Sequence, residues 1–231
     1  MYLKDSYLKE CEATVTSVSE GKYVILDQTI FYPRGGGQPH DTGEIIKDGI
    51  AYNVVYVVAL SGEISHEVDR PGLTEGEKVR CVLNWQRRYK LMRSHTAAHV
   101  FASLLCEGTG ALITGNQINV DKTRFDFSLD YYDRALIEQY IEKANRLFST
   151  KTAVEWYELP REEALQIPGC IKMANAFPPD TPTLRIVEIT GVDKQADGGT
   201  HVRTLGEVGE ITLLKTENKG RKNRRVYFSV G

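Results

Sequence analysis

The first third of the chain carries short runs of β-branched and aromatic residues, separated by glycine and polar residues. These runs predict strands at residues 13–18, 23–32, 50–60 and 78–83. Residues 61–77 are broken by glycine and proline, which predicts a connecting stretch. Since no helical period interrupts this region, the pattern favours an all-β, barrel-like N-terminal domain.

A helical period follows. Asn84 is suited to cap the start of a helix and Gly108 to end it. Between them apolar residues recur every three to four positions and spread over much of the circumference. We therefore expect this helix to be central to its domain, with His95 and His99 on an interior or cleft-lining face.

The rest of the chain mixes strand and helix patterns. Strands are predicted at residues 111–114, 117–120, 123–128, 154–159, 184–189, 210–216 and 225–230. A helix is predicted from a cap at Asp130 to about Phe148, a short one over residues 160–166, and a loop over residues 171–182. Because strands and helices do not alternate as βαβ units, the predicted fold class is α+β, with a β-barrel domain over residues 1–85 and an α+β domain over residues 86–231.

Composition adds little to this picture. With 41% hydrophobic and 26% charged residues in 231, the chain is typical of a globular protein of one or two domains. It has no apolar run long enough to span a bilayer and no signal-peptide layout, so we expect a cytoplasmic protein without a membrane partner. The four cysteines (Cys11, Cys81, Cys106 and Cys170) lack CxxC spacing, which favours buried free thiols over a disulfide framework or a cysteine-rich zinc site.

A run of three glycines, Gly35, Gly36 and Gly37, precedes Gln38 within the strand-rich region. Glycines tolerate positive φ and allow another group to approach closely. The run matches neither GxxxxGK[ST] nor a strand–GxGxxG–helix arrangement, so no nucleotide cofactor is predicted. A tight turn is the simplest interpretation.

Two histidine-containing pairs are the strongest chemical signal. His95 and His99 are four residues apart on the predicted helix, so their imidazoles share one face. Asp197 and His201 have the same spacing in a glycine-containing turn. Each pair alone is weak, because HxxxH is more often a core or surface feature and a glycine turn is often only a turn. The two pairs hold three of the five histidines, and His40 and His66 are predicted to lie in loops. Together the pairs predict one Zn²⁺ per chain.

Charge is informative only locally. The net charge of -2 argues against binding nucleic acid through overall charge. Residues 215–225, however, hold six basic residues against one acid. This segment is suited to contact phosphates, and it is equally typical of a solvated turn between two strands.

Several segments, taken in order, resemble a known family. Residues 93–99, 124–128 and 198–202 are similar to the editing domain of alanyl-tRNA synthetase and to its free-standing relatives, the AlaX proteins. Residues 31–39, with Asp41 and Gly43, resemble the N-terminal barrel of that family. The resemblance covers nearly the whole chain, and no segment is similar to the synthetase core that activates alanine. It implies a free-standing editing protein of the medium-length type, with a glycine-motif barrel and a zinc-containing editing (deacylase) domain.

One position departs from the family pattern. Where the family has cysteine directly before Gly-Gly-Thr-His, this chain has Asp197. A carboxylate is a competent zinc ligand, so we expect Asp197 to ligate the metal. The alternatives are a three-histidine site with Asp197 orienting a ligand, or the loss of both zinc and activity.

The resemblance implies hydrolysis of the ester that joins serine or glycine to the terminal adenosine of alanine tRNA, with His95, His99 and His201 at the catalytic centre. Zinc can polarise the ester carbonyl and lower the pKa of bound water to about 7. If four protein ligands fill the metal's positions, the coordination must expand, or a ribose hydroxyl or nearby water must carry the chemistry.

The resemblance also assigns substrate contacts. Thr114 is similar to a threonine that binds the serine hydroxyl, a contact that would reject alanine. Gly35, Gly36, Gly37 and Gln38 are expected to border the amino-acid pocket and to tune the choice between serine and glycine. The candidate contacts to mischarged tRNA(Ala) are Lys219, Arg221, Lys222, Arg224 and Arg225.

Three other functional classes remain. The first is a catalytically impaired, zinc-stabilised tRNA-binding module, if Asp197 has disabled the site. The second is a metal-dependent hydrolase of small esters or amides, and the third is a purely structural zinc site.

Overall fold

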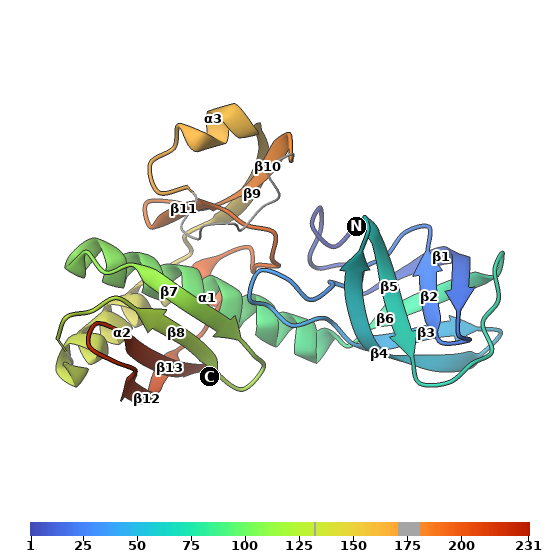
Figure 1. Ribbon diagram of the computed structural model, residues 1–231, viewed down its shortest axis with the longest axis horizontal. Helices are drawn as coiled ribbons and strands as arrows, with labels where there is room; N and C mark the ends of the chain where they lie inside the picture. The colour runs from blue at the N-terminus through green and yellow to red at the C-terminus, as the bar shows by residue number, and fades with distance from the viewer. Residues whose placement is uncertain (132, 171–180) are drawn as a thin grey trace. The chain divides into compact units, whose positions relative to one another are not determined.

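The computed structural model describes residues 1–131, 133–170 and 181–231 (Figure 1). The chain divides into two compact units, Met1–Tyr89 and Lys90–Gly231. The division falls inside one helix, α1 (Trp85–Thr109). Of the loop predicted over residues 171–182, residues 171–180 lie outside the described residues. Helices and strands are mixed as the sequence predicts. No helix among the described residues has the length and apolar character needed to cross a membrane.

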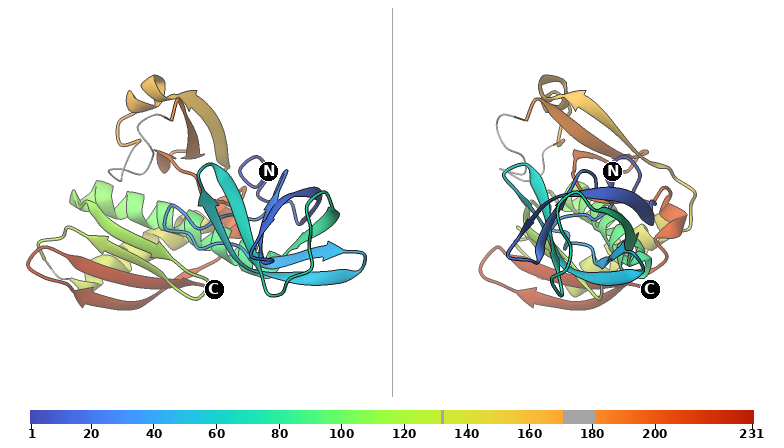
Figure 2. Two further views of the ribbon diagram at one scale, coloured as in Figure 1. Left: turned by 45° about the vertical axis from the view of Figure 1, so that its right-hand side comes forward. Right: turned by 90° about the vertical axis from the view of Figure 1, so that its right-hand side faces the viewer.

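The first unit is a closed barrel of six strands. These are β1 (Glu10–Ser19), β2 (Tyr23–Leu26), β3 (Gly43–Lys47), β4 (Ile50–Leu60), β5 (Glu63–Val68) and β6 (Lys78–Leu83). Their spatial order is β1-β2-β5-β4-β3-β6, and antiparallel pairing of β6 with β1 closes the barrel (Figure 2). The predicted strands 50–60 and 78–83 are confirmed.

Alternation of buried and exposed positions explains the barrel interior. In β6, Val79, Cys81 and Leu83 are buried, whereas Lys78 and Arg80 are exposed. The inward residues join a single apolar cluster that includes Val24 and Ile45. Because successive side chains on a strand point to opposite faces, this alternation leaves one face of each strand for the core.

Parts of the barrel prediction are wrong. The strand predicted over 23–32 ends at Leu26, and β3 and β5 were not predicted. The connecting stretch that we expected contains β5, in which His66 is fully buried rather than in a loop. Its ring lies 2.8 Å from Thr29 Oγ1 and 2.9 Å from the Val24 carbonyl oxygen. The polar His66 hid the strand, because its ring is buried with hydrogen-bond partners inside the barrel.

The glycine run forms a tight turn, as predicted. The Gly35 and Gln38 backbones exchange hydrogen bonds of 3.1 and 2.8 Å. Between them Gly36 and Gly37 have φ values of 56° and 82°. Two successive positive φ angles are the geometry of a two-residue hairpin turn, for which glycine has no steric penalty.

The same unit contains a buried ion pair between Arg88 and Asp41. The Arg88 Nε donates to both Asp41 carboxylate oxygens, at 3.1 and 3.0 Å. Its other nitrogens donate to the carbonyl oxygens of Ser6 and Ile30. Asp41 also accepts a 2.7 Å hydrogen bond from the Tyr32 N–H. Both side chains are fully buried, so every charge here is compensated by atoms of the barrel unit.

Helix α1 begins where the sequence predicts and ends later than it predicts. The Arg87 N–H donates to Asn84 Oδ1 at 3.1 Å, which confirms Asn84 as the cap. The helix continues through Gly108 to Thr109, and Gly110 with a φ of 71° follows it. A Cβ on Gly108 would lie 1.8 Å from the Tyr140 hydroxyl oxygen, so Gly108 permits close packing rather than ending the helix.

The described residues of the second unit form two sheets. The four-stranded sheet has the order β12 (Ile211–Asn218), β13 (Arg224–Val230), β8 (Thr123–Phe127) and β7 (Ile113–Ile118). The three-stranded sheet has the order β11 (Asp193–Ala196), β10 (Thr183–Ile189) and β9 (Val154–Pro160). Helix α1 lies beside both sheets (Figure 1). Phe101 packs on Phe127 of β8 and Phe228 of β13. His99 Nδ1 lies 2.9 Å from Asp193 Oδ2 on β11.

Smaller differences concern element boundaries. Helix α2 (Arg134–Phe148) is capped by Asp133 rather than Asp130. Helix α3 (Arg161–Leu165) follows Pro160, and a short 3₁₀ helix, η1, spans Leu205–Glu207. The two strands predicted at 111–114 and 117–120 are one strand, β7, with a register shift between Ile113 and Gly115 where it pairs with β8. Strand β11, which leads into the Asp197 turn, was not predicted.

Candidate metal centre

The two histidine-containing pairs meet inside the second unit. His95 and His99 lie one turn apart on α1, and Asp197 and His201 lie in the turn that follows β11. One ligand atom from each residue lies within 4.8 Å of all the others. The three histidines are buried and Asp197 is nearly so.

The carboxylate of Asp197 is at the centre of the group. Its Oδ1 is 3.5 Å from His95 Nε2 and 3.8 Å from His99 Nε2. Its Oδ2 is 3.0 Å from His201 Nε2. The Nε2 atoms of all three imidazoles therefore face one carboxylate.

The opposite ring nitrogens of two histidines are held by neighbouring side chains. His99 Nδ1 lies 2.9 Å from Asp193 Oδ2, and Gln195 Nε2 donates to the same oxygen at 2.8 Å. His201 Nδ1 lies 3.1 Å from the Thr96 hydroxyl. A partner at Nδ1 fixes the ring orientation and leaves the Nε2 lone pair for another ligand.

The turn that carries Asp197 is shaped for this cluster. The Gly199 N–H donates to Asp197 Oδ2 at 2.6 Å. A Cβ on Gly199 would lie 2.0 Å from His95 Cε1, so only glycine lets that imidazole pack against the turn. Arg185 on β10 donates to the carbonyl oxygens of Asp197 and Gly199, at 3.0 and 3.1 Å. Its guanidinium also lies 5.2 Å from the centre of the Trp156 ring.

Burial and neighbouring charges shift the pKa values of the four side chains in different directions. Burial lowers the pKa of His201 to about 4 and that of His95 well below its ordinary value, although Asp197 opposes both shifts. Burial also acts against the charged form of His99, but the Asp193 and Asp197 carboxylates outweigh it and raise the pKa of His99 to about 9. The neighbouring histidines hold the pKa of Asp197 well below its ordinary value in spite of its burial. The group thus contains an ionised carboxylate and two neutral imidazoles, and its charge is balanced by a cation at its centre or by a proton on His99.

These residues could hold a metal ion, and their ligand types and spacing are compatible with zinc. Bonds of about 2.0–2.2 Å in a tetrahedral site place neighbouring ligand atoms roughly 3.3–3.5 Å apart. The distances from Asp197 Oδ1 to His95 Nε2 and His99 Nε2 are 3.5 and 3.8 Å, at and slightly above this value, and one ligand atom from each of the four residues lies within 4.8 Å of the others. Three imidazoles and one carboxylate are also ligand types that zinc accepts.

Sequence reasoning missed the residues that surround the cluster. Asp193 and Gln195 come from β11, which was not predicted, and Arg185 comes from β10, which precedes the turn by several residues. Thr96 lies between His95 and His99 in the sequence. This position is the only sequence signal that Thr96 contacts His201. Because these contacts join separate elements, local spacing does not reveal them.

The other candidate site residues are not part of the cluster. Thr114 is exposed on β7, and its hydroxyl donates to Asn223 Oδ1 at 3.4 Å. Gly35–Gly37 are exposed at the barrel turn, whereas Gln38 is buried.

The basic segment forms the end of the β12–β13 hairpin. Arg221 and Lys222 are exposed, and Lys222 pairs with Asp130 at 3.1 Å. Lys219 pairs with Glu217 at 3.0 Å, and Arg225 makes two hydrogen bonds of 2.6 and 2.9 Å to Asp126.

Arg224 requires a correction, because it is buried. Its guanidinium donates to the carbonyl oxygens of Gly220, Asn223 and Asp130. It therefore stabilises the hairpin and does not present a charge to solvent.

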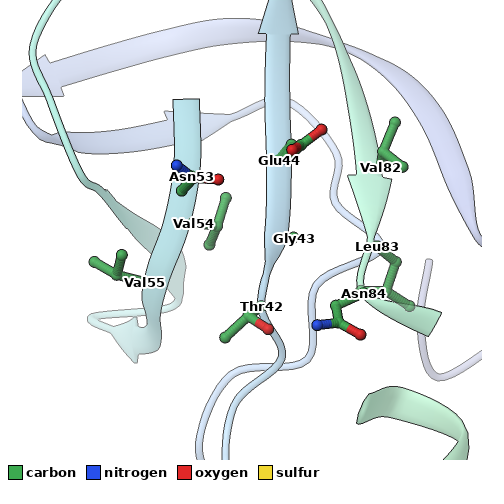
Figure 3. Close-up of a pocket in the computed structure, with 9 residues that line it drawn as sticks. All are labelled: Thr42, Gly43, Glu44, Asn53, Val54, Val55, Val82, Leu83 and Asn84. Atoms are coloured by element: carbon green, nitrogen blue, oxygen red, sulfur yellow. The ribbon is translucent and has the colours of Figure 1, made fainter. Parts of the chain in front are cut away.

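Two pockets lie away from the four ligands. One is on the barrel, where β3, β4 and β6 contribute residues such as Gly43, Asn53 and Leu83 (Figure 3). Gly43 has no room for a side chain there, because a Cβ would lie 2.2 Å from the Val82 carbonyl oxygen. The other pocket, in the second unit, includes Ser103, Glu107 and Asp193 in its lining. Asp193 therefore contacts His99 and lines this second pocket.

Comparisons with known proteins define first a class. Residues 5–87 match a family model described as tRNA synthetases class II (A). Residues 184–227, which include the Asp197 turn, match the model of the threonyl and alanyl tRNA synthetase second additional domain. The chain is thus built from modules found in aminoacyl-tRNA synthetases.

Full-length relatives define the family. The chain is 44% identical over 237 residues to the alanyl-tRNA editing protein AlaX-M of Methanosarcina barkeri, covering 100% of this chain and 98% of that protein. It is 48% identical over 233 residues to the AlaX-M of Saccharolobus solfataricus, with the same coverage. Alanine–tRNA ligase of Pyrococcus abyssi is 39% identical over 237 residues, but the match covers only 26% of that protein. The chain belongs to the AlaX-M family of alanyl-tRNA editing proteins.

Proposed function

We propose that the protein is a zinc-dependent hydrolase that deacylates mischarged alanine tRNA, with serine and, secondarily, glycine as the amino acids removed. The observation that carries this proposal is the convergence of His95, His99, Asp197 and His201 on one buried point, in a chain of an editing family. Ester hydrolysis needs a polarised carbonyl and a nucleophile, and a metal site of this composition can assist both.

The four side chains would hold one zinc ion per chain. When bound, zinc supplies Lewis acidity, which polarises an ester carbonyl or acidifies a water molecule. The chain's own residues supply the orientation. Asp193 and Thr96 fix the rings of His99 and His201, and Arg185 holds the carbonyl groups of the turn that carries Asp197. These contacts support the assignment of Asp197 as a ligand in the place of the family's cysteine.

Substrate selection is the part of the proposal that depends most on family resemblance. We retain Thr114 as a candidate for the serine hydroxyl and Gly35–Gln38 as candidates for tuning the amino-acid choice. Thr114→Val keeps the side-chain shape and removes the hydroxyl, so it should lower the preference for serine over alanine if the assignment holds. The same rate ratio in parent and variant would remove Thr114 from the site.

The proposed tRNA contact is the β12–β13 hairpin, through Lys219, Arg221, Lys222 and Arg225, with Arg224 now excluded by its burial. Replacing both Arg221 and Lys222 by alanine should weaken tRNA binding and reduce its salt slope by about one for each lost phosphate contact. The matched control is Arg134→Ala, which removes an exposed arginine on α2 that pairs with Glu138 at 2.8 Å. Unchanged affinity and salt slope would place the RNA contact elsewhere.

The deciding experiment measures deacylation of serine-charged and alanine-charged tRNA(Ala), with zinc determined on the same sample. The parent should bind about one zinc per chain and remove serine only. Asp197→Ala should lose both zinc and activity, whereas Asp197→Cys should keep both. The control is Asp121→Ala, because Asp121 is an exposed acid outside the cluster.

The alternative function gives a different result. A catalytically impaired, zinc-stabilised tRNA-binding module would bind zinc and tRNA in the parent and turn over neither substrate. Recovery of turnover only in Asp197→Cys would show that the aspartate is what disables the site. Hydrolysis of small esters without any effect of tRNA would instead favour a hydrolase with another substrate.

A further inference from the structure

Two cysteines far apart in the sequence are direct neighbours in the barrel. Cys11 on β1 and Cys81 on β6 are register partners in the antiparallel pair that closes the barrel. Both side chains face the interior, where Cys11 packs against the apolar cluster that contains Cys81. Both are free thiols in this structure.

Their register places them near the separations at which disulfides form. Residues directly opposite in an antiparallel pair have Cα atoms about 4.5–5.5 Å apart and Cβ atoms about 4.5–5.5 Å apart. Disulfides form with Cα separations of roughly 4.4–6.8 Å and Cβ separations near 3.5–4.5 Å. The two thiols are also close enough to share a hydrogen bond. Only a small adjustment of the Cβ positions therefore separates the pair from a covalent bond.

The two thiols differ in exposure and in pKa, so Cys11 is the one that meets an oxidant first. Cys81 is fully buried, whereas Cys11 is partly exposed. The hydrogen bond from the Cys81 thiol lowers the pKa of Cys11, although burial opposes this shift. The same hydrogen bond, together with burial, raises the pKa of Cys81. A partly exposed cysteine with a lowered pKa, next to a second thiol, is more susceptible to oxidants than a buried cysteine with a raised pKa.

We propose that Cys11 and Cys81 are an oxidation site that closes to a disulfide across the β1–β6 seam, with peroxides as the oxidant. The Cys11 thiolate attacks hydrogen peroxide, the O–O bond breaks, and a sulfenic acid and hydroxide form. The Cys81 sulfur then attacks the Cys11 sulfur, the S–O bond breaks, and water leaves with the Cys81 proton. Two thiols lose two electrons in total and the peroxide gains them. A thiol reductant such as glutathione reverses the bond by exchange.

The bond would strengthen the one pairing that closes the barrel. Strands β1 and β6 are the first and last strands of the barrel in sequence, so a covalent link between them restricts the unfolded chain over the whole unit. The remaining cysteines, Cys106 and Cys170, lie in the second unit, one on α1 and one after α3. They provide matched controls in the same chain.

The test treats the full, zinc-loaded protein with hydrogen peroxide or, separately, with oxidised glutathione. Intact mass should fall by the mass of two hydrogen atoms, and non-reducing peptide mapping should link the peptides that contain Cys11 and Cys81. Cys11→Ser should abolish this link, and Cys106→Ser and Cys170→Ser should leave it unchanged. The unfolding midpoint of the oxidised parent should rise by about 5 °C or more and return on reduction, with no such rise in Cys11→Ser.

Two results would overturn the proposal. One is a sulfinic acid or a glutathione adduct on Cys11 without a link to Cys81. The other is a link that involves Cys106 or Cys170. Since peptide mapping of the parent decides between these outcomes, the test holds even if Cys11→Ser fails to fold.

Discussion

Each unit buries a cluster of charged and polar side chains, and the two clusters are completed in different ways. In the barrel unit, Arg88 and Asp41 neutralise each other, and their remaining hydrogen-bonding groups contact Ser6, Ile30 and Tyr32. In the second unit, three imidazole nitrogens and a carboxylate face one another, and burial keeps two of the imidazoles neutral. The first cluster contains its own cation, the Arg88 guanidinium. The second cluster instead brings together lone pairs on imidazole nitrogens and carboxylate oxygens, which can bind a metal ion. This difference separates a structural centre from a candidate metal site, although most side chains of both clusters are buried.

The largest expected effect comes from removing one partner of the buried Arg88–Asp41 ion pair. Arg88→Met leaves Asp41 as an uncompensated buried charge, so the free energy of unfolding should fall by about 3–5 kcal/mol. The double variant Arg88→Met, Asp41→Leu should recover most of this loss, because both charges are removed together. Urea unfolding measures both changes.

The control for this prediction is the neighbouring arginine. Arg87→Met removes a guanidinium that donates to the His40 carbonyl and leaves no buried charge behind, so its cost should be small. Zinc content should stay at the parent value in all of these variants. If Arg88→Met lowers the free energy of unfolding by less than about 1 kcal/mol, the pair contributes no more than an exposed ion pair and leaves no uncompensated buried charge when it is broken.

His66 supplies a second contrast, since it is a buried histidine that is not a ligand. Burial lowers its pKa to about 4, while the unfolded chain keeps the ordinary value near 6.5. Between pH 6.5 and pH 4 the folded protein therefore binds fewer protons than the unfolded chain. The stability that depends on a neutral His66 is lost as the pH falls through this range. A gap of about 2.5 pH units corresponds to roughly 3 kcal/mol. Above pH 6.5 this contribution is fully present.

Comparing His66→Gln with the parent isolates that contribution. The parent should lose more stability than the variant between pH 7 and pH 4.5 in urea unfolding, because glutamine does not titrate. The other histidines are common to both proteins, so their contributions cancel in the difference. His40→Gln is the matched control on the same unit. Parallel pH profiles for parent and His66→Gln would contradict the shift.

The sequence predicts those features that rest on local periodicity. The strands 50–60 and 78–83, the start of α1 and the turn at Gly35–Gln38 follow from alternation, a cap and consecutive glycines. The four candidate ligands also follow from the i, i+4 spacing of two pairs. In each case the signal and the structure lie within a few residues of each other.

What the sequence did not predict depends on contacts between distant segments. Strand β5 was missed because His66 is polar, and its burial depends on Thr29 and Val24. The sequence predicts a helix end at Gly108, whereas the role of this glycine is set by Tyr140 on another helix. The contact of Cys11 with Cys81 likewise exists only because β1 and β6 pair. Tertiary partners, rather than local propensity, decide these positions.

The smallest expected effect tests the support of the metal site. Asp193 Oδ2 is 2.9 Å from His99 Nδ1, and Asp193→Asn keeps the shape of the side chain while removing its charge. Partners of this kind typically change metal affinity by about 10- to 100-fold, or about 1.4–2.7 kcal/mol. Zinc competition with a chelator should therefore show weaker binding in Asp193→Asn and none of this loss in Asp121→Asn, an exposed acid. If Asp193→Asn held zinc within about threefold of the parent, the ring of His99 would be oriented without Asp193. Zinc binding by the second cluster would then depend only on its four candidate ligands. In the same way, the Arg88–Asp41 pair depends only on the atoms in direct contact with it.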